Sequence, residues 1–201
     1  IAMKDETKKN KRKINAPNKL TLLRIALAPV FLVVLTLDVP HSSLAAFLIF
    51  TAASITDFID GKLARSTNQV TALGKLLDPL ADKMLITAAL LGFMLSGECN
   101  VFIAFVILLR EYTVTGVRMI ALTDGIVIPA NIFGKIKTAS QMVSVALIIA
   151  LNEWLHIGKT LPFDIKVFSN VILAFTAVMA VASGIIYIVE AAKRINFLEN
   201  R

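Results

Sequence analysis

The sequence is poor in the residues that build disulfide scaffolds and zinc sites. Its 201 residues include one cysteine and two histidines. Cys99 cannot form an intrachain disulfide, and no second metal-binding residue stands at a metal-ligand spacing from it. His41 and His156 fall in or near two links between apolar stretches, where we expect solvated surface residues rather than ligands. These shortages exclude a disulfide-stapled domain and argue against structural zinc.

Recognisable subdivisions and processing signals are also lacking. The chain has no internal repeat and no low-complexity tract. No cleavable secretory signal is visible, because the basic N-terminus leads into a long span with no small-residue cleavage site after a short apolar core. We therefore predict a flexible basic extension over residues 1–13 and a single membrane domain over residues 14–201.

Hydrophobic residues dominate, at 57% of the chain against 17% charged residues, and the mean hydropathy is +0.76. This composition excludes an ordinary soluble domain and predicts an all-α, polytopic membrane protein. A short interfacial segment is predicted from Ile14 to Lys19, with Pro17 near a helix start. Six transmembrane helices are predicted, at 19–38, 44–66, 73–96, 101–123, 134–155 and 168–192.

Positive charge is unevenly distributed along the chain. Residues 4–13 contain six Lys or Arg, whereas the links at 39–43 and 97–100 contain none. A basic tail could bind nucleic acid, but beside a membrane span it more often holds the chain on the cytoplasmic side, against anionic lipid. We predict no nucleic-acid partner and place both termini in the cytoplasm.

Four of the eight aspartates fall within the 26 residues from Asp57 to Asp82. An aspartate at the centre of a membrane helix costs at least about 2.5–3.5 kcal/mol, so four of them indicate a bound cation. Asp57 and Asp60 are three residues apart, and Asp78 and Asp82 are four apart, so each pair shares one helix face. Two such helices would bring the four carboxylates together in a cavity open to the cytoplasm.

An all-carboxylate site without nearby histidine or cysteine suits Mg²⁺ or Mn²⁺ rather than zinc. Two ions could fit, sharing one bridging carboxylate and clamping phosphoryl oxygens. Gly61, Ala64 and Gly74 leave room for a ligand against the helix backbone. Close packing of the helices through small residues is the alternative for these three positions.

The spacing of these residues resembles the complete signature of the CDP-alcohol phosphotransferases: Asp57-x2-Asp60-Gly61-x2-Ala64-Arg65-x8-Gly74-x3-Asp78-x3-Asp82. The resemblance implies six-helix integral membrane enzymes, usually homodimers, that transfer a phosphatidyl or similar group from a CDP-linked donor to an alcohol and release CMP. It also implies that Asp57, Asp60 and Asp78 ligate metal, and that Asp82 is a further ligand and the general base.

The donor site is implied by the same resemblance. Upstream of the signature, Pro17-Asn18-x2-Thr21-x2-Arg24 resembles the family's first-helix motif near the nucleotide pyrophosphate. The residues that the resemblance assigns to the CDP donor are Asn18, Thr21, Arg24, Asp57, Gly61, Ala64, Arg65, Gly74 and Asp78.

Basic residues in the fourth and fifth spans point to the acceptor. Glu111 stands seven residues before Arg118, so we expect an internal ion pair between them. The surplus cations suit a phosphate on the acceptor; they are Arg110, Arg118, Lys135 and Lys137. The stretches 110–118 and 134–138 resemble the phosphatidylglycerophosphate synthase branch of the family. Members of that branch join CDP-diacylglycerol to sn-glycerol 3-phosphate. The resemblance to its bacterial members implies a location in the bacterial cell membrane.

Several alternatives stay open. Within the family, the acceptor could be inositol 1-phosphate, serine or phosphatidylglycerol. A cation transporter would more often show repeated halves with matching broken helices, which the sequence lacks. The aspartates could instead be structural and paired with nearby cations, but this does not explain their spacing; those cations are Lys62, Arg65, Lys75 and Lys83.

Overall fold

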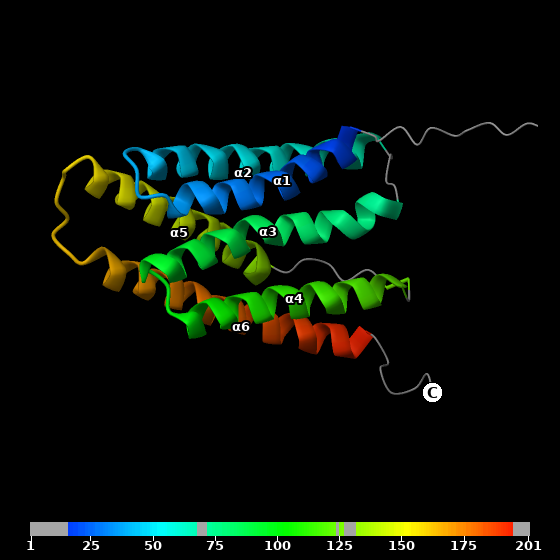
Figure 1. Ribbon diagram of the computed structural model, residues 1–201. Coiled ribbons are helices and arrows are strands. Elements are labelled where there is room, and N and C mark those ends of the chain that lie inside the picture. The colour runs from blue at the N-terminus through cyan, green and yellow to red at the C-terminus, as the bar shows by residue number, and fades with distance from the viewer. Residues whose placement is uncertain (1–15, 68–71, 124, 127–131, 195–201) are drawn as a thin grey trace, which may run out of the picture.

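The computed structural model describes residues 16–67, 72–123, 125–126 and 132–194. It describes the helical backbone without the side chain for residues 16–20, 57–67, 72–78, 82 and 123. The described part of the chain is helical and contains no strand (Figure 1). The helices are α1 (Ala16–Thr36), α2 (Ser42–Thr67), α3 (Ala72–Ser96), α4 (Val101–Thr123), α5 (Ile132–His156) and α6 (Ile165–Arg194).

A helix lies at each of the six places where a membrane span was predicted. The largest differences are three residues, at the starts of α1 (16 against 19) and α6 (165 against 168). The interfacial segment predicted before the first span is not separate, because α1 runs without a break from Ala16. Pro17 does not interrupt α1, since the amide hydrogen that proline lacks has no helical partner in a first turn. Residues 14 and 15 of that segment lie outside the described residues.

Short capped turns make consecutive helices antiparallel at one end of the bundle. Gly97, with a φ of 78°, follows the last residue of α3 in the left-handed conformation that ends many helices. The Asn100 side chain caps α4 by accepting from the Phe102 amide at 2.9 Å. Asp164 caps α6 by accepting from the Lys166 amide at 2.7 Å.

The six helices pack around a closed ring in the order α1, α3, α4, α6, α5, α2, and α2 also contacts α3. The main core cluster runs through this ring and includes Phe31, Phe50, Leu90, Ile107 and Ile148. Gly92 of α3 permits the close approach of α1, since a Cβ built there would lie 2.5 Å from Leu35 Cδ2. Helices distant in sequence thus become neighbours, and long polar side chains can meet inside the ring.

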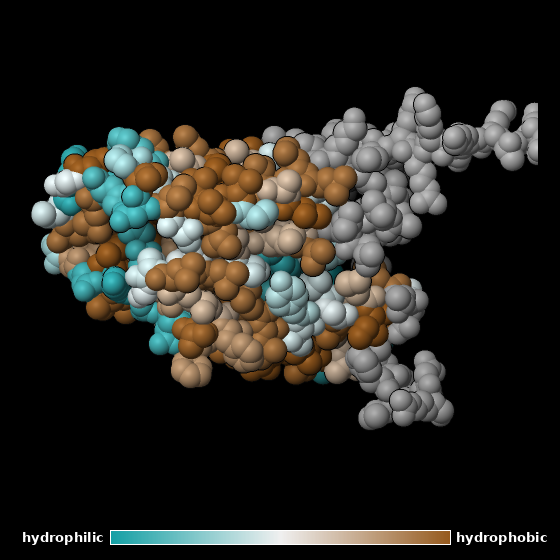
Figure 2. Space-filling view, viewed as in Figure 1, coloured by the Kyte–Doolittle hydropathy of each residue, from teal (hydrophilic) through white to brown (hydrophobic). Residues whose placement is uncertain are grey.

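The two ends of the bundle differ. We call the end where α1 starts and α6 ends the tail end, and the end with the links 37–41, 97–100 and 157–164 the turn end (Figure 1). Hydrophilic residues gather at the turn end in Figure 2, whereas apolar side chains cover much of the flank. Three described helical segments are long and apolar enough to cross a membrane: Pro79–Ser96, Ile132–His156 and Ile165–Arg194. The chain is therefore a helical protein with a membrane-type exterior.

Candidate active site

The predicted metal ligands lie on two contacting helices at the tail end. Asp57 and Asp60 are in the last turns of α2, and Asp78 and Asp82 are in the first three turns of α3. Their side chains lie outside the described residues, so the convergence of the four carboxylates stays a prediction. Among the described side chains, no group of three His, Cys, Asp or Glu residues could hold a metal ion.

The predicted donor residues occupy these two helices, α2 and α3, and also α1. Thr21 and Arg24 have described side chains, and both are buried, at 3% and 6% exposure. They belong to the buried face of α1 that continues through Ala28 and Phe31, so they point into the bundle rather than outward. The side chains of the remaining donor candidates lie outside the described residues; these are Asn18, Asp57, Gly61, Ala64, Arg65, Gly74 and Asp78.

Glu111 of α4 lies at the centre of a buried charge network inside the ring. Its carboxylate accepts from Lys83 Nζ of α3 at 2.7 Å and from Arg110 Nη1 at 3.1 Å. It also accepts from Lys137 Nζ of α5, which donates to the Gln141 side-chain oxygen as well. A single carboxylate thus joins cations from three helices, and Lys83 is the residue directly after the predicted base.

The four predicted acceptor residues divide into two pairs by their surroundings. Arg110 and Lys137 belong to the Glu111 network, and Lys137 is only 1% exposed. Arg118 and Lys135 are exposed and lie nearer the tail end of α4 and α5. Arg118 Nε donates to Tyr187 Oη of α6 at 3.4 Å, and its guanidinium carbon lies 5.6 Å from the Tyr187 ring centroid.

The predicted ion pair between Glu111 and Arg118 is wrong. Among the described residues, Glu111 pairs with Lys83, Arg110 and Lys137, whereas Arg118 contacts Tyr187. Seven residues separate Glu111 from Arg118, which is about 10 Å along the helix axis. Cations on the neighbouring helices lie closer to the carboxylate than a residue two turns away on the same helix.

Four residues near the acceptor candidates were not predicted as part of the site. Lys83 could have been found from its place beside Asp82 in the signature, and Gln141 from its position four residues after Lys137. Ser183 accepts from Arg110 Nη2 at 3.0 Å, and Tyr187 lies against Arg118. Both stand in a mostly apolar stretch of α6, where a single hydroxyl gives no sequence signal for a site.

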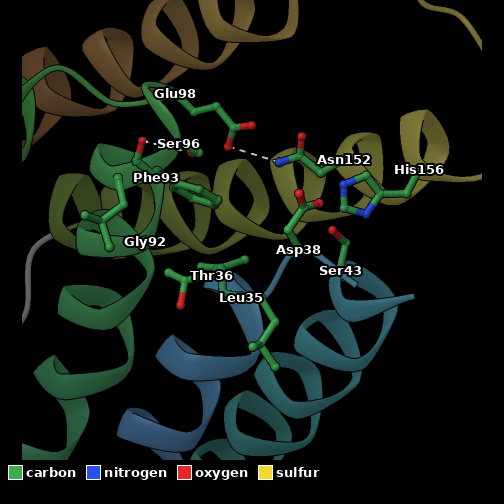
Figure 3. A pocket seen from close by; sticks show the side chains of 12 residues that line it. Leu35, Thr36, Asp38, Ser43, Gly92, Phe93, Ser96, Glu98, Asn152 and His156 are labelled. Atoms are coloured by element: carbon green, nitrogen blue, oxygen red, sulfur yellow. Dashed lines mark hydrogen bonds between the residues drawn. The ribbon is translucent and has the colours of Figure 1, made fainter. Parts of the chain in front are cut away.

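A separate polar cavity of about 230 Å³ lies at the turn end (Figure 3). Glu98, in the link between α3 and α4, accepts from the Asn152 side-chain amide there at 3.0 Å. Burial raises the pKa of Glu98 above its ordinary value, and the hydrogen bond from Asn152 acts in the opposite direction. Because this cavity is at the end of the bundle remote from the four predicted metal ligands of α2 and α3, it is not the predicted active site.

Glu111→Gln should lower the apparent Tm of the purified protein in detergent. The substitution leaves three mutually repelling cations around a neutral amide, and removing one partner of a buried ion pair costs about 3–5 kcal/mol. Glu98→Gln is the matched control, because Glu98 is as buried as Glu111 (5% against 6% exposed) but hydrogen-bonds to an amide. The control should change Tm little. Equal losses in the two variants would contradict the structural role given to the Glu111 network.

Comparison with known proteins gives one consistent family. The CDP-alcohol phosphatidyltransferase family model matches residues 14–185. A Bacillus subtilis (strain 168) protein named CDP-diacylglycerol–glycerol-3-phosphate 3-phosphatidyltransferase is 39% identical over 166 residues, which cover 77% of this chain and 82% of the relative.

Two further relatives cover similar shares. A Mycobacterium tuberculosis (strain CDC 1551 / Oshkosh) protein named probable phosphatidylglycerophosphate synthase is 37% identical over 185 residues, covering 90% of this chain and 83% of the relative. A Rickettsia bellii (strain RML369-C) protein with the same name as the Bacillus relative is 31% identical over 173 residues, covering 86% of this chain and 93% of the relative.

Proposed function

Because the chain belongs to the CDP-alcohol phosphatidyltransferase family, we propose that it transfers the phosphatidyl group of CDP-diacylglycerol to sn-glycerol 3-phosphate in phospholipid biosynthesis. The products are phosphatidylglycerophosphate and CMP. The names of the relatives support this acceptor. The observation that carries the proposal is the arrangement at the tail end, where the aspartate-bearing α2 and α3 adjoin the basic residues of α4 and α5.

The reaction needs an activated hydroxyl and a leaving nucleotide. A hydroxyl oxygen of glycerol 3-phosphate forms a bond to the phosphorus that carries diacylglycerol, and the bond from that phosphorus to CMP breaks. The hydroxyl proton passes to Asp82, because an alcohol near pH 7 is a poor nucleophile until a base removes its proton. Asp82 can accept the proton if it does not hold a metal through both of its oxygens.

The donor set suits a divalent metal. Asp57, Asp60 and Asp78, with Asp82 as a further ligand, would supply oxygen ligands alone, which Mg²⁺ and Mn²⁺ prefer. When bound, one or two such ions would neutralise the negative charge of the donor diphosphate. The buried Thr21 and Arg24 would hold the same diphosphate from α1, which packs against both α2 and α3.

The acceptor phosphate would be held by Arg110, Arg118, Lys135 and Lys137. Charge-assisted contacts of this kind are favoured for phosphate, and an arginine can make two parallel hydrogen bonds to it. Glu111 holds Arg110 and Lys137 beside each other before the acceptor arrives. A neutral acceptor such as serine would bring no negative charge to this basic set, which the single carboxylate of Glu111 neutralises only in part.

The membrane arrangement follows from helix length and charge. The helices have 21–30 residues, which is about 32–45 Å and enough to cross a hydrocarbon core of about 30 Å. With 23 residues, α4 is also long enough to cross, although it carries Arg110, Glu111 and Arg118. Glu111 pairs with lysines of α3 and α5, and both arginines contact α6. We propose six spans with the tail end in the cytoplasm. We also propose a homodimer, as the family resemblance implies.

An acceptor panel tests the proposed function. Purified protein, CDP-diacylglycerol and Mg²⁺ are mixed with glycerol 3-phosphate, inositol 1-phosphate, serine, phosphatidylglycerol or glycerol, and CMP release is measured. Glycerol 3-phosphate should be used and glycerol should be nearly inert, since one lost charge-assisted contact costs about 1.5–3 kcal/mol. Faster turnover with inositol 1-phosphate or serine would overturn the acceptor assignment. No CMP with any acceptor would instead favour a cation-binding transporter.

A further inference from the structure

One face of α6 contacts both arginines that are proposed to bind the acceptor phosphate. Ser183 Oγ accepts from Arg110 Nη2 at 3.0 Å. Tyr187 Oη accepts from Arg118 Nε at 3.4 Å, and the Tyr187 ring lies beneath the guanidinium at 5.6 Å. Between these two residues, Gly184 leaves space for the Arg110 stem, since a Cβ there would lie 3.0 Å from Arg110 Cγ.

These three positions of α6 share a direction. Tyr187 stands four residues after Ser183 and three residues after Gly184, so the three positions lie on one helix face. All three are buried, whereas their neighbours Ile185 and Ile186 are exposed. The hydroxyls of Ser183 and Tyr187 therefore point inward, toward the two arginines of α4.

Such contacts limit the motion of long side chains. A free arginine samples many rotamers, and this freedom is lost when the guanidinium binds a ligand. An anchor that fixes the rotamer beforehand reduces the entropy lost at binding and so favours affinity. Tyr187 engages only Nε of Arg118, which leaves both terminal nitrogens of that guanidinium for a phosphate. In Arg110, Nη2 donates to Ser183 and Nη1 donates to Glu111, so one hydrogen on each terminal nitrogen is left for a phosphate.

We propose that Ser183 and Tyr187 are positioning residues, which hold Arg110 and Arg118 in the orientation that binds the acceptor phosphate. The inference rests on the proposed function, in which these arginines contact that phosphate. Neither α6 residue belongs to the aspartate signature or to the basic stretches of α4 and α5. Their effect is therefore specific to the acceptor and does not extend to the CDP donor.

The test measures KM for each substrate separately, from CMP release. Ser183→Ala and Tyr187→Phe should each raise the KM for glycerol 3-phosphate by about two- to tenfold, and the KM for CDP-diacylglycerol should stay unchanged. Ser169→Ala is the control for the serine, because Ser169 is also buried in α6 but near the turn end. Tyr112→Phe is the control for the tyrosine, because Tyr112 is an exposed residue of α4. Both controls should match the wild type.

A double-mutant cycle separates positioning from general damage. In an Arg118→Ala background, Tyr187→Phe should cause no further rise in the acceptor KM, because the side chain that it positions is gone. Additive effects would overturn the inference, as would Ser183→Ala and Tyr187→Phe behaving like their controls. Because KM does not depend on the fraction of folded enzyme, partial misfolding does not obscure either outcome. If Arg110→Ala and Arg118→Ala themselves leave the acceptor KM unchanged, the proposed acceptor site fails instead.

Discussion

Changing Asp57, Asp60 or Asp78 to asparagine, one at a time, is expected to abolish CMP release. Each change removes one negative charge and one ligand oxygen from the predicted metal site on α2 and α3. A divalent ion held by fewer carboxylates binds more weakly, and the donor diphosphate then loses the charge that neutralises it. Turnover and CDP-diacylglycerol binding should therefore fall together, which equilibrium binding of the donor and CMP release would measure.

Two further measurements make this first result specific. Asp38→Asn is the control, because Asp38 lines the cavity at the turn end, and this variant should keep wild-type activity. Chelation with EDTA should abolish CMP release by the wild-type protein, and added Mg²⁺ or Mn²⁺ should restore this activity. Full activity after rigorous chelation would show that catalysis does not depend on a metal. Active asparagine variants would show that these aspartates are not required.

Asp82→Asn is expected to separate catalysis from donor binding. If Asp82 is the base, its loss should lower kcat by about 10²–10⁴-fold, since asparagine cannot take the proton from the acceptor hydroxyl. Much of the affinity for CDP-diacylglycerol should remain, because the other three aspartates still ligate metal. Measuring kcat and donor binding on the same preparation tests both parts. A variant that loses donor binding as fully as Asp57→Asn would show that Asp82 is chiefly a ligand.

The helices could be predicted from the sequence because their signal is local. Long apolar stretches separated by Gly97, Asp164 and the basic links determine where each helix starts and ends. The aspartate signature is also a local pattern, since its fixed spacings predict which residues share a helix face. What the spacing could not give was which helices become neighbours around the ring, because that depends on packing between distant segments.

The partner of Glu111 shows this limit most clearly. Sequence spacing suggested Arg118 on the same helix, but the carboxylate binds Lys83 and Lys137, which come from α3 and α5. The hydroxyl of Ser183 was missed for the same reason, since it acts on Arg110 from a helix 73 positions further along the chain. These buried contacts join different helices, and the residue spacing along one helix carries no information about contacts with another helix.

Phosphatidyl transfer to glycerol 3-phosphate is tested most directly by following the acceptor into the lipid product. Purified protein is incubated with CDP-diacylglycerol, Mg²⁺ and glycerol 3-phosphate labelled with ¹³C. The lipid and nucleotide products are then identified and quantified by mass spectrometry. Phosphatidyl transfer to glycerol 3-phosphate should give a labelled lipid with two phosphates, formed in equal amount with unlabelled CMP. CMP without labelled lipid would mean hydrolysis of the donor, and label in the nucleotide would mean attack at the wrong phosphorus; either result would contradict phosphatidyl transfer to glycerol 3-phosphate.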